Sequence, residues 1–186
     1  MEKVLLISGE TLKTETVIND NVDDAYIRPA IECSQDIYLH QLIGTSLLND
    51  LCDKVRENTL TDDDKLLLDE YITPYLKFKV CSEITLVLAY KYRNAGIVQT
   101  QTDFVSNSIM KDAQLMKDYY DQRANFYAIR LTDWLCANSA KFPNYHNHKV
   151  GDVCPNRGAY NTNIFLGNIK TPCKNMWEIY ECDSIV

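Results

Sequence analysis

Several features that identify enzymes, zinc proteins and membrane proteins are missing from this sequence. It contains no Gly-rich phosphate loop and no Gly-x-Ser-x-Gly elbow. None of its seven cysteines belongs to a Cys-x-x-Cys pair, so the usual zinc knuckles are absent. No stretch approaches the roughly 18 consecutive apolar residues of a transmembrane helix. These absences favour a protein that is not an enzyme, needs no cofactor and does not enter a membrane.

Basic residues are also scarce. The chain has 19 Lys and Arg against 26 Asp and Glu, which gives a net charge of −7, and it has no basic cluster. Nucleic-acid affinity depends on Lys and Arg that displace counterions from phosphates, so we expect no autonomous DNA binding. The same deficit argues against binding to an anionic membrane surface.

The rest of the composition is that of a folded globular chain. The 186 residues are 46% apolar and 24% charged, which is enough for one domain with a core. The 12 tyrosines suit wet protein interfaces, and they equally suit half-buried helix faces. Residues 1–7 lack the pattern of a secretory signal, so we expect free thiols in a cytoplasm-like compartment.

Apolar periodicity predicts four to five helices between residues 23 and 140. Residues 1–20 are expected to form an irregular lead-in, with a short strand over 4–7 as one option. Asp23 or Asp24 can then cap a helix, and Gly44 is placed to end it. A second helix follows with Leu47, Leu48 and Leu51 on its apolar side.

Two longer helical regions follow. Thr61 precedes three aspartates, which is typical of a capped helix start, and Pro74 divides the next apolar run into predicted helices over 62–72 and 74–93. Alternating residues over 96–104 predict a strand or hairpin arm. From Ile109 a regular stripe predicts a helix of about 32 residues, or about 48 Å.

The polar residues of this last helix suggest an interface. Lys117, Asp118, Asp121 and Gln122 are assigned to the face opposite the apolar stripe, and Lys117 and Asp121 are spaced for an ion pair. Because the helix is longer than one small core can cover, we expect this polar face to contact a neighbouring subunit. The other interpretation is a face exposed to solvent.

The sequence changes character at Pro143. Residues 143–186 contain three of the five prolines, three of the six glycines and seven asparagines, and they have no helical period. Short apolar islands interrupt them, so we expect an extended arm that gains burial on another surface. The side chains expected to make that contact are Phe165, Leu166, Trp177, Ile179 and Tyr180.

The same region holds the one set of candidate metal ligands. Its spacings match no standard zinc pattern, so scattered thiols and a solvated His pair are the main interpretation and a metal site the lesser one. The acidic runs at 23–24 and 62–64 are interpreted as helix caps. The set comprises His146, His148, Cys154, Cys173 and Cys182.

The order of features over the first 140 residues resembles the head–tail connector, or neck adaptor, family of tailed bacteriophages. The similarity lies in an acidic cap at Asp23-Asp24, then Gln35-Asp36-Ile37-Tyr38, then Leu42-Ile43-Gly44. The segment from Leu60-Thr61 into the long helical pair continues it. The C-terminal arm is similar to the extended termini of neck-ring proteins in crAss-like phages.

This resemblance implies a mainly α fold: a compact bundle of four to five helices with a short extended hairpin or strand arm. Residues 1–142 would form the connector body and 143–186 the extended C-terminal arm. It further implies a virion protein, made in the host cytoplasm, that forms a closed and typically twelve-fold ring between portal and tail. Other neck and tail proteins would be its partners, and DNA would pass without specific binding. A small helical accessory or regulatory protein, or a metal-binding protein using the C-terminal Cys and His residues, remain the alternatives.

Overall fold

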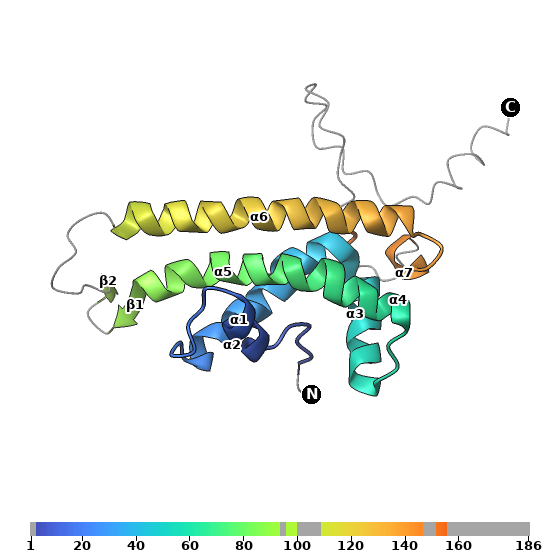
Figure 1. Cartoon of the computed structure of the whole chain (residues 1–186), viewed down its shortest axis with the longest axis horizontal. Coiled ribbons are helices and arrows are strands. Elements are labelled where there is room, and N and C mark those ends of the chain that lie inside the picture. The colour runs from blue at the N-terminus through green and yellow to red at the C-terminus, as the bar shows by residue number, and fades with distance from the viewer. Residues whose placement is uncertain (1–2, 94–95, 100–108, 147–151, 156–186) are drawn as a thin grey trace, which may run out of the picture.

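The computed structural model describes residues 3–93, 96–99, 109–146 and 152–155 (Figure 1). The fold is mainly α, as predicted from the apolar periodicity. Within these ranges no helix is both long enough and apolar enough to cross a membrane. The elements in chain order are α1 (Gly9–Glu15), α2 (Asp24–Cys33), the π-helical η1 (Ser34–Leu39), α3 (His40–Glu57), α4 (Asp62–Leu67), the π-helical η2 (Leu68–Ile72), α5 (Thr73–Ala89), β1 (Tyr90–Arg93), β2 (Gly96–Gln99), α6 (Ile109–Ala137) and α7 (Pro143–His146).

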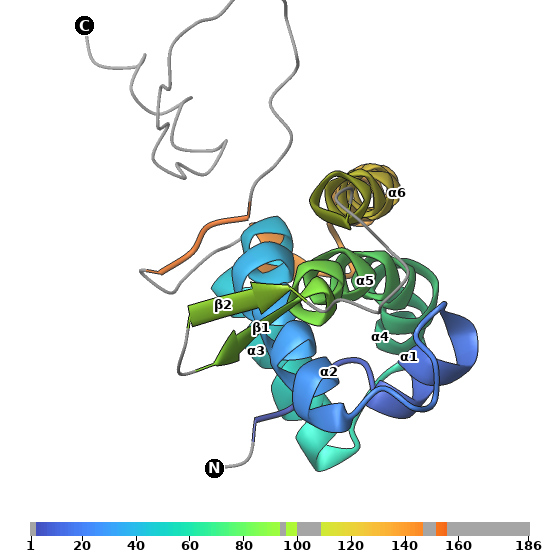
Figure 2. The ribbon, with the colours of Figure 1, turned by 90° about the vertical axis from the view of Figure 1, so that its left-hand side faces the viewer.

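Helix α5 lies at the centre of the arrangement. Helix α6 runs alongside it in the opposite direction and covers one of its sides (Figure 1). Helices α1 and α2 lie on the other side, so that α5 is enclosed between two layers (Figure 2). This placement explains why α5 is rich in apolar residues, since it must bury side chains toward both layers.

Helices α5 and α6 make the most extensive contact between any two described elements. Leu76, Val80 and Ile84 of α5 are buried, as their four-residue spacing predicts. From α6, the predicted stripe supplies buried Tyr120, Ala124 and Leu131. Phe78 of α5 stacks on Tyr127 of α6 at 5.4 Å between ring centroids, and Tyr71 of η2 stacks on Trp134 of α6 at 4.6 Å.

The first helical region follows the predicted caps. Asp23 accepts a hydrogen bond from the Ala25 amide at 3.0 Å and begins α2. The helix continues through η1 into α3, where Gly44 adopts φ +77° and ψ 161° and breaks the helical path. The predicted end at Gly44 is therefore confirmed, and Leu47, Leu48 and Leu51 are buried beyond it.

The lead-in is more ordered than the sequence suggested. Instead of an irregular segment with a strand over 4–7, it contains helix α1, which Ser8 caps by accepting from the Thr11 amide. Gln35 holds the segment before it, because its amide accepts from the Leu6 N–H and donates to the Val4 carbonyl, each at 3.0 Å. The Gln35 side chain thus makes backbone hydrogen bonds that a neighbouring strand would otherwise make. Local periodicity could not reveal this contact between distant residues.

The predicted helix start at Thr61 is present in full. The Thr61 hydroxyl accepts from the Asp64 amide at 3.2 Å, and the Asp64 carboxylate accepts from the Thr61 amide at 3.0 Å. The two helices predicted around Pro74 form one continuous path, however. The π-helical η2 precedes α5, and its wider turn accommodates the missing N–H of Pro74 without ending the helix.

A short antiparallel ladder follows α5. Strand β1 pairs with β2 so that Tyr90 lies opposite Gln99 and Arg93 opposite Gly96. Helix α5 therefore ends at Ala89 rather than at the predicted residue 93. Of the strand or hairpin arm predicted over 96–104, only 96–99 fall within the described residues.

We expect Thr61→Ala to lower the free energy of unfolding by about 1 kcal/mol, because it removes the cap hydroxyl at the start of α4. Urea denaturation followed by circular dichroism measures the change. Thr59→Ala is the matched control, since Thr59 is exposed and its described hydrogen bond uses the backbone amide. Equal losses in the two variants would contradict a role for the cap.

Candidate functional site

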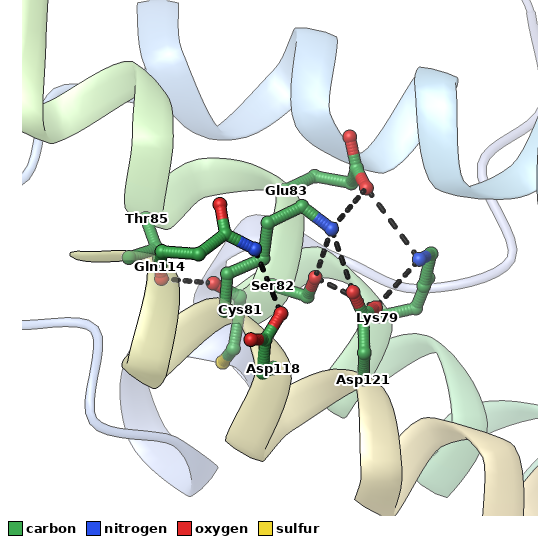
Figure 3. A network of polar contacts seen from close by, with 9 residues as sticks. Lys79, Cys81, Ser82, Glu83, Thr85, Gln114, Asp118 and Asp121 are labelled. Carbon is green, nitrogen blue, oxygen red and sulfur yellow. Dashed lines mark hydrogen bonds and ion pairs between the residues drawn. The ribbon is translucent and has the colours of Figure 1, made fainter. Parts of the chain in front are cut away.

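A network of charged side chains joins α5 to α6 near the middle of their contact (Figure 3). The Asp121 carboxylate accepts hydrogen bonds from Lys117 Nζ at 2.6 Å, Lys79 Nζ at 2.7 Å and Ser82 Oγ at 2.8 Å. Glu83 lies beside them, with its Oε1 3.5 Å from Lys79 Nζ and 4.0 Å from Lys117 Nζ. Two cations therefore face two carboxylates across the helix pair.

The network extends to η1 through an aromatic ring. Lys79 Nζ lies 3.7 Å from the centroid of the Tyr38 ring, a cation–π contact between α5 and η1. Burial raises the pKa of Tyr38 to about 12, and the nearby Glu83 charge adds to the rise. Tyr38 is therefore a neutral hydroxyl near neutral pH rather than a proton acceptor.

The pKa of Asp121 reflects its partners. Burial raises the pKa of this carboxyl, but the hydrogen bonds from Lys117, Lys79 and Ser82 outweigh burial and lower it to about 2. The reciprocal contact raises the pKa of Lys117 despite the opposing effect of burial. Both groups keep their charges across the physiological range, which suits a structural clamp between helices.

This arrangement offers little for catalysis or metal binding. The Asp121 carboxylate already accepts three hydrogen bonds from the protein, which limits its capacity to take up a proton or coordinate a cation. In the described ranges, no group of three Cys, His, Asp or Glu side chains is arranged to hold a metal ion. We therefore interpret the network as the polar part of the body's core.

The predicted polar face of α6 is divided by the structure. The Lys117–Asp121 ion pair is confirmed, but both side chains point toward α5, so their assignment to the face opposite the apolar stripe is wrong. Asp118 is exposed and accepts from Gln114 at 2.7 Å, and Gln122 is exposed as well. Helical spacing alone missed this because lysine stems can flank a core while their charges remain paired.

The outward side of α6 carries apolar residues that the sequence analysis did not single out. Leu115 is 66% exposed, Tyr119 45%, Phe126 63% and Ile129 62%. Their spacing of four, seven and three residues places them on one face, opposite α5. We call Leu115, Tyr119, Gln122, Phe126 and Ile129 the outer face of α6. The regular spacing was visible in the sequence, but the stronger inner stripe concealed it.

A second notable arrangement lies where the chain returns to α3 after α7. The Thr45 amide donates to the Val153 carbonyl at 3.0 Å, and the Val153 amide donates to Thr45 Oγ1 at 3.1 Å. Thr45 Oγ1 also lies 2.7 Å from a ring nitrogen of His40 and 3.1 Å from the Asp152 carboxylate. We call residues 152–155 the return segment, because they bring the chain back to the break in α3.

Gly44 and Pro155 complete this contact. A Cβ atom at Gly44 would lie 2.7 Å from Pro155 Cδ, so a side chain there would collide with the return segment. Tyr145 of α7, which precedes the return segment in the chain, is fully buried, and α7 packs on α3. Residues 143–146 and 152–155 thus belong to the helical body, although the sequence analysis assigned all of 143–186 to an arm.

The other predicted contact residues lie outside the described ranges. These are Phe165, Leu166, Trp177, Ile179 and Tyr180. Of the candidate metal ligands, only His146 and Cys154 are described. A ring nitrogen of His146 lies 3.5 Å from the Leu135 carbonyl oxygen, and Cys154 is exposed.

A shallow groove opens between residues 17–22, α5 and α6. Its volume is about 330 Å³, and most of its lining is apolar, with Val17, Leu88, Met116 and Tyr120 among the contributors. Small-molecule sites usually combine such walls with convergent polar groups. The described lining offers mainly Asn19 and Thr85 in that role, so the groove suits packing against a protein more than binding a polar substrate.

We expect Asp121→Asn to reduce the free energy of unfolding by roughly 2 kcal/mol at pH 7, because Asn cannot balance both lysines. The carboxyl pKa falls from 3.8 to about 2 on folding, so the stabilisation is present above about pH 4 and is lost as the pH falls toward 2. Urea titrations at several pH values should show the difference between wild type and variant shrinking over that window. Asp118→Asn, on the exposed side, should change the stability of the monomer by less than about 0.5 kcal/mol. A pH-independent loss would contradict this account.

We expect Gly44→Ala to cost about 1–3 kcal/mol, because a side chain is strained at this backbone geometry and collides with Pro155. Gly9→Ala is the matched control, since a Cβ there would meet Ile27 at an ordinary 3.7 Å. Thermal unfolding of both variants measures the difference. Equal melting temperatures in Gly44→Ala and wild type would show that the return segment does not restrain the body.

The comparisons with known proteins give a family but no activity. A family model described as a family of unknown function (DUF6712) matches residues 39–154. The match runs from the end of η1 through α7 into the return segment. No curated protein and no solved structure matches the chain. The chain therefore belongs to the DUF6712 family, whose function is unknown.

Proposed function

We propose that this protein is a structural subunit of a ring in the neck of a tailed bacteriophage, where it joins the portal to the tail around the DNA passage. The proposal combines the resemblance of the first 140 residues to neck adaptors with the arrangement of the described body. It makes the protein a virion component, produced in the host cytoplasm, with its own copies and other neck proteins as partners.

The observation that carries the proposal is the return segment. Hydrogen bonds between Thr45 and Val153, together with the close approach of Pro155 to Gly44, fix the position of Pro155 on the body. Residues 156–186 follow this fixed point and contain the apolar islands. Because every subunit would present these islands from the same position on its body, each copy can offer them to the same site on a neighbour, which favours a regular assembly.

Two further features support a ring subunit. Helix α6 has 29 residues and is about 43 Å long, so it offers a long, straight contact surface. The net charge of −7 suits a passage that must let DNA slide without holding it. The proposed arm after residue 155 would cover neighbouring copies, in a ring that we expect to be twelve-fold.

The alternative is a small helical accessory or regulatory protein. The exposed outer face of α6 favours it specifically, because a dimer could cover such a face without any ring. The presence or absence of the protein in purified virions separates the two functions.

We expect removal of residues 156–186 to leave a folded body that no longer enters virions, because the truncation keeps the return segment but removes the apolar islands. Complementation of a phage that lacks the gene, followed by quantitative mass spectrometry of purified virions, measures incorporation. The full-length chain should appear at a fixed copy number, consistent with one ring per particle.

The melting temperature of the truncated chain is the control, and it should stay within a few degrees of the melting temperature of the full-length protein. A full-length chain that is absent from virions would refute the proposed function. Incorporation of the truncated chain at normal copy number would refute the role of the arm. If truncation unfolds the body, the islands pack on their own subunit instead.

A further inference from the structure

The outer face of α6 is exposed along its whole length in the described structure. Figures 1 and 2 show α5 on one side of α6 and none of the other described elements on the opposite side. The four large side chains of this face are 45–66% exposed. Exposed apolar side chains aligned over several turns are unfavourable in water and mark a contact surface.

The spacing of the face identifies the kind of partner. Leu115, Tyr119, Gln122, Phe126 and Ile129 are separated by four, three, four and three residues. This alternation is the a/d repeat of helices that pack at a shallow angle, with Tyr119 and Phe126 at a and the other three at d. The geometry points to a second helix as the occupant, rather than a strand or an irregular segment.

We infer that the occupant is α6 of a second copy of this chain, parallel and in register. In that arrangement each side chain of the outer face meets its own counterpart. The central layer then places Gln122 opposite Gln122 of the second copy, where the two amides can hydrogen-bond. A polar residue at a core position is a recognised device for fixing register and orientation.

The charges beside the face agree with the parallel arrangement. Asp118 occupies a g position, and the residue facing it across a parallel pair is Arg123 of the second copy, five residues further on. Arg123 lies over the Tyr119 ring at 3.3 Å from its centroid, which holds the guanidinium beside the face. The symmetry of the pair produces this Asp–Arg contact twice.

The antiparallel arrangement over the same segment is less favourable. It would bring Arg123 of each copy together and would place Gln122 against Phe126, leaving the amide without a partner. Asp133 marks the end of the parallel contact, because its exposed carboxylate would meet its counterpart in the next layer. The apolar contact therefore extends from Leu115 to Ile129.

This inference does not depend on the proposed function. Neighbours in a closed ring meet through two different patches, whereas the α6 pair uses the same patch on both copies. Loss of the pair would leave the ring proposal unaffected, and absence from virions would leave the pair unaffected.

Sedimentation velocity of the full chain, at roughly 1–100 µM, tests the pair. The wild type should shift toward twice its mass of 21.4 kDa. Phe126→Glu should weaken association at least tenfold, according to the cost of burying two charges, with the melting temperature of the monomer unchanged. Asn125→Glu should tighten it by up to about threefold, because a parallel pair sets position 125 against Arg130 of the second copy twice. The gain is limited because Arg130 already contacts the Tyr71 ring and the Glu70 carbonyl.

Each contrary result overturns the inference. A wild type that stays monomeric at roughly 100 µM has no such pair. Weaker association of Asn125→Glu would indicate antiparallel helices, in which the two new carboxylates face one another. A monomer whose melting temperature falls in Phe126→Glu would show that another part of the same chain covers the face.

Disulfide trapping gives an independent measure of register. Gln122→Cys should cross-link two copies under mild oxidation, because the d positions of a parallel pair face each other. Gln114→Cys is the matched control on the same helix, exposed but away from the outer face, and it should not cross-link. Equal cross-linking of the two would overturn the register. Both variants are made in a chain with serine at positions 136, 154, 173 and 182.

Discussion

The contact between α5 and α6 is the constraint on which the rest of this fold depends. Helix α5 presents apolar side chains on more than one side, so it is unstable in water unless it is enclosed. Helix α6 supplies one wall, and its Asp121 neutralises the lysines that border the apolar zone. Because unpaired charges at this position would be costly, the polar network and the apolar core stabilise the same alignment of the two helices.

The parts of the fold that could be predicted from the sequence are those decided within a few residues. The Thr61–Asp64 box, the Asp23 cap and the left-handed backbone at Gly44 each depend on neighbouring groups. The inner stripe of α6 could be predicted equally well, because apolar residues spaced three or four apart over so many turns indicate an amphipathic helix. The mainly α fold follows from these local rules.

The remainder depended on contacts between distant residues. Nothing near Val153 in the sequence indicates Thr45 as its partner, and nothing near Val4 indicates Gln35. The inward position of Lys117 and Asp121 likewise required Lys79 and Ser82, which lie on another helix. These charged residues were assigned to the side of the helix away from the apolar stripe, and that assignment fails where opposite charges can meet across a core.

The position of α2 bears on whether the part of the chain that matches the family model can fold alone. The matched range begins at residue 39, yet Ile27 and Ile31, which belong to the same core as α5, precede it. Excised at the family boundaries, the chain would expose one side of its central helix to water. The region that matches the family model is therefore smaller than the region that must fold together. Any relative that shares only the matched part must shield its own α5 counterpart with a different segment or with another molecule.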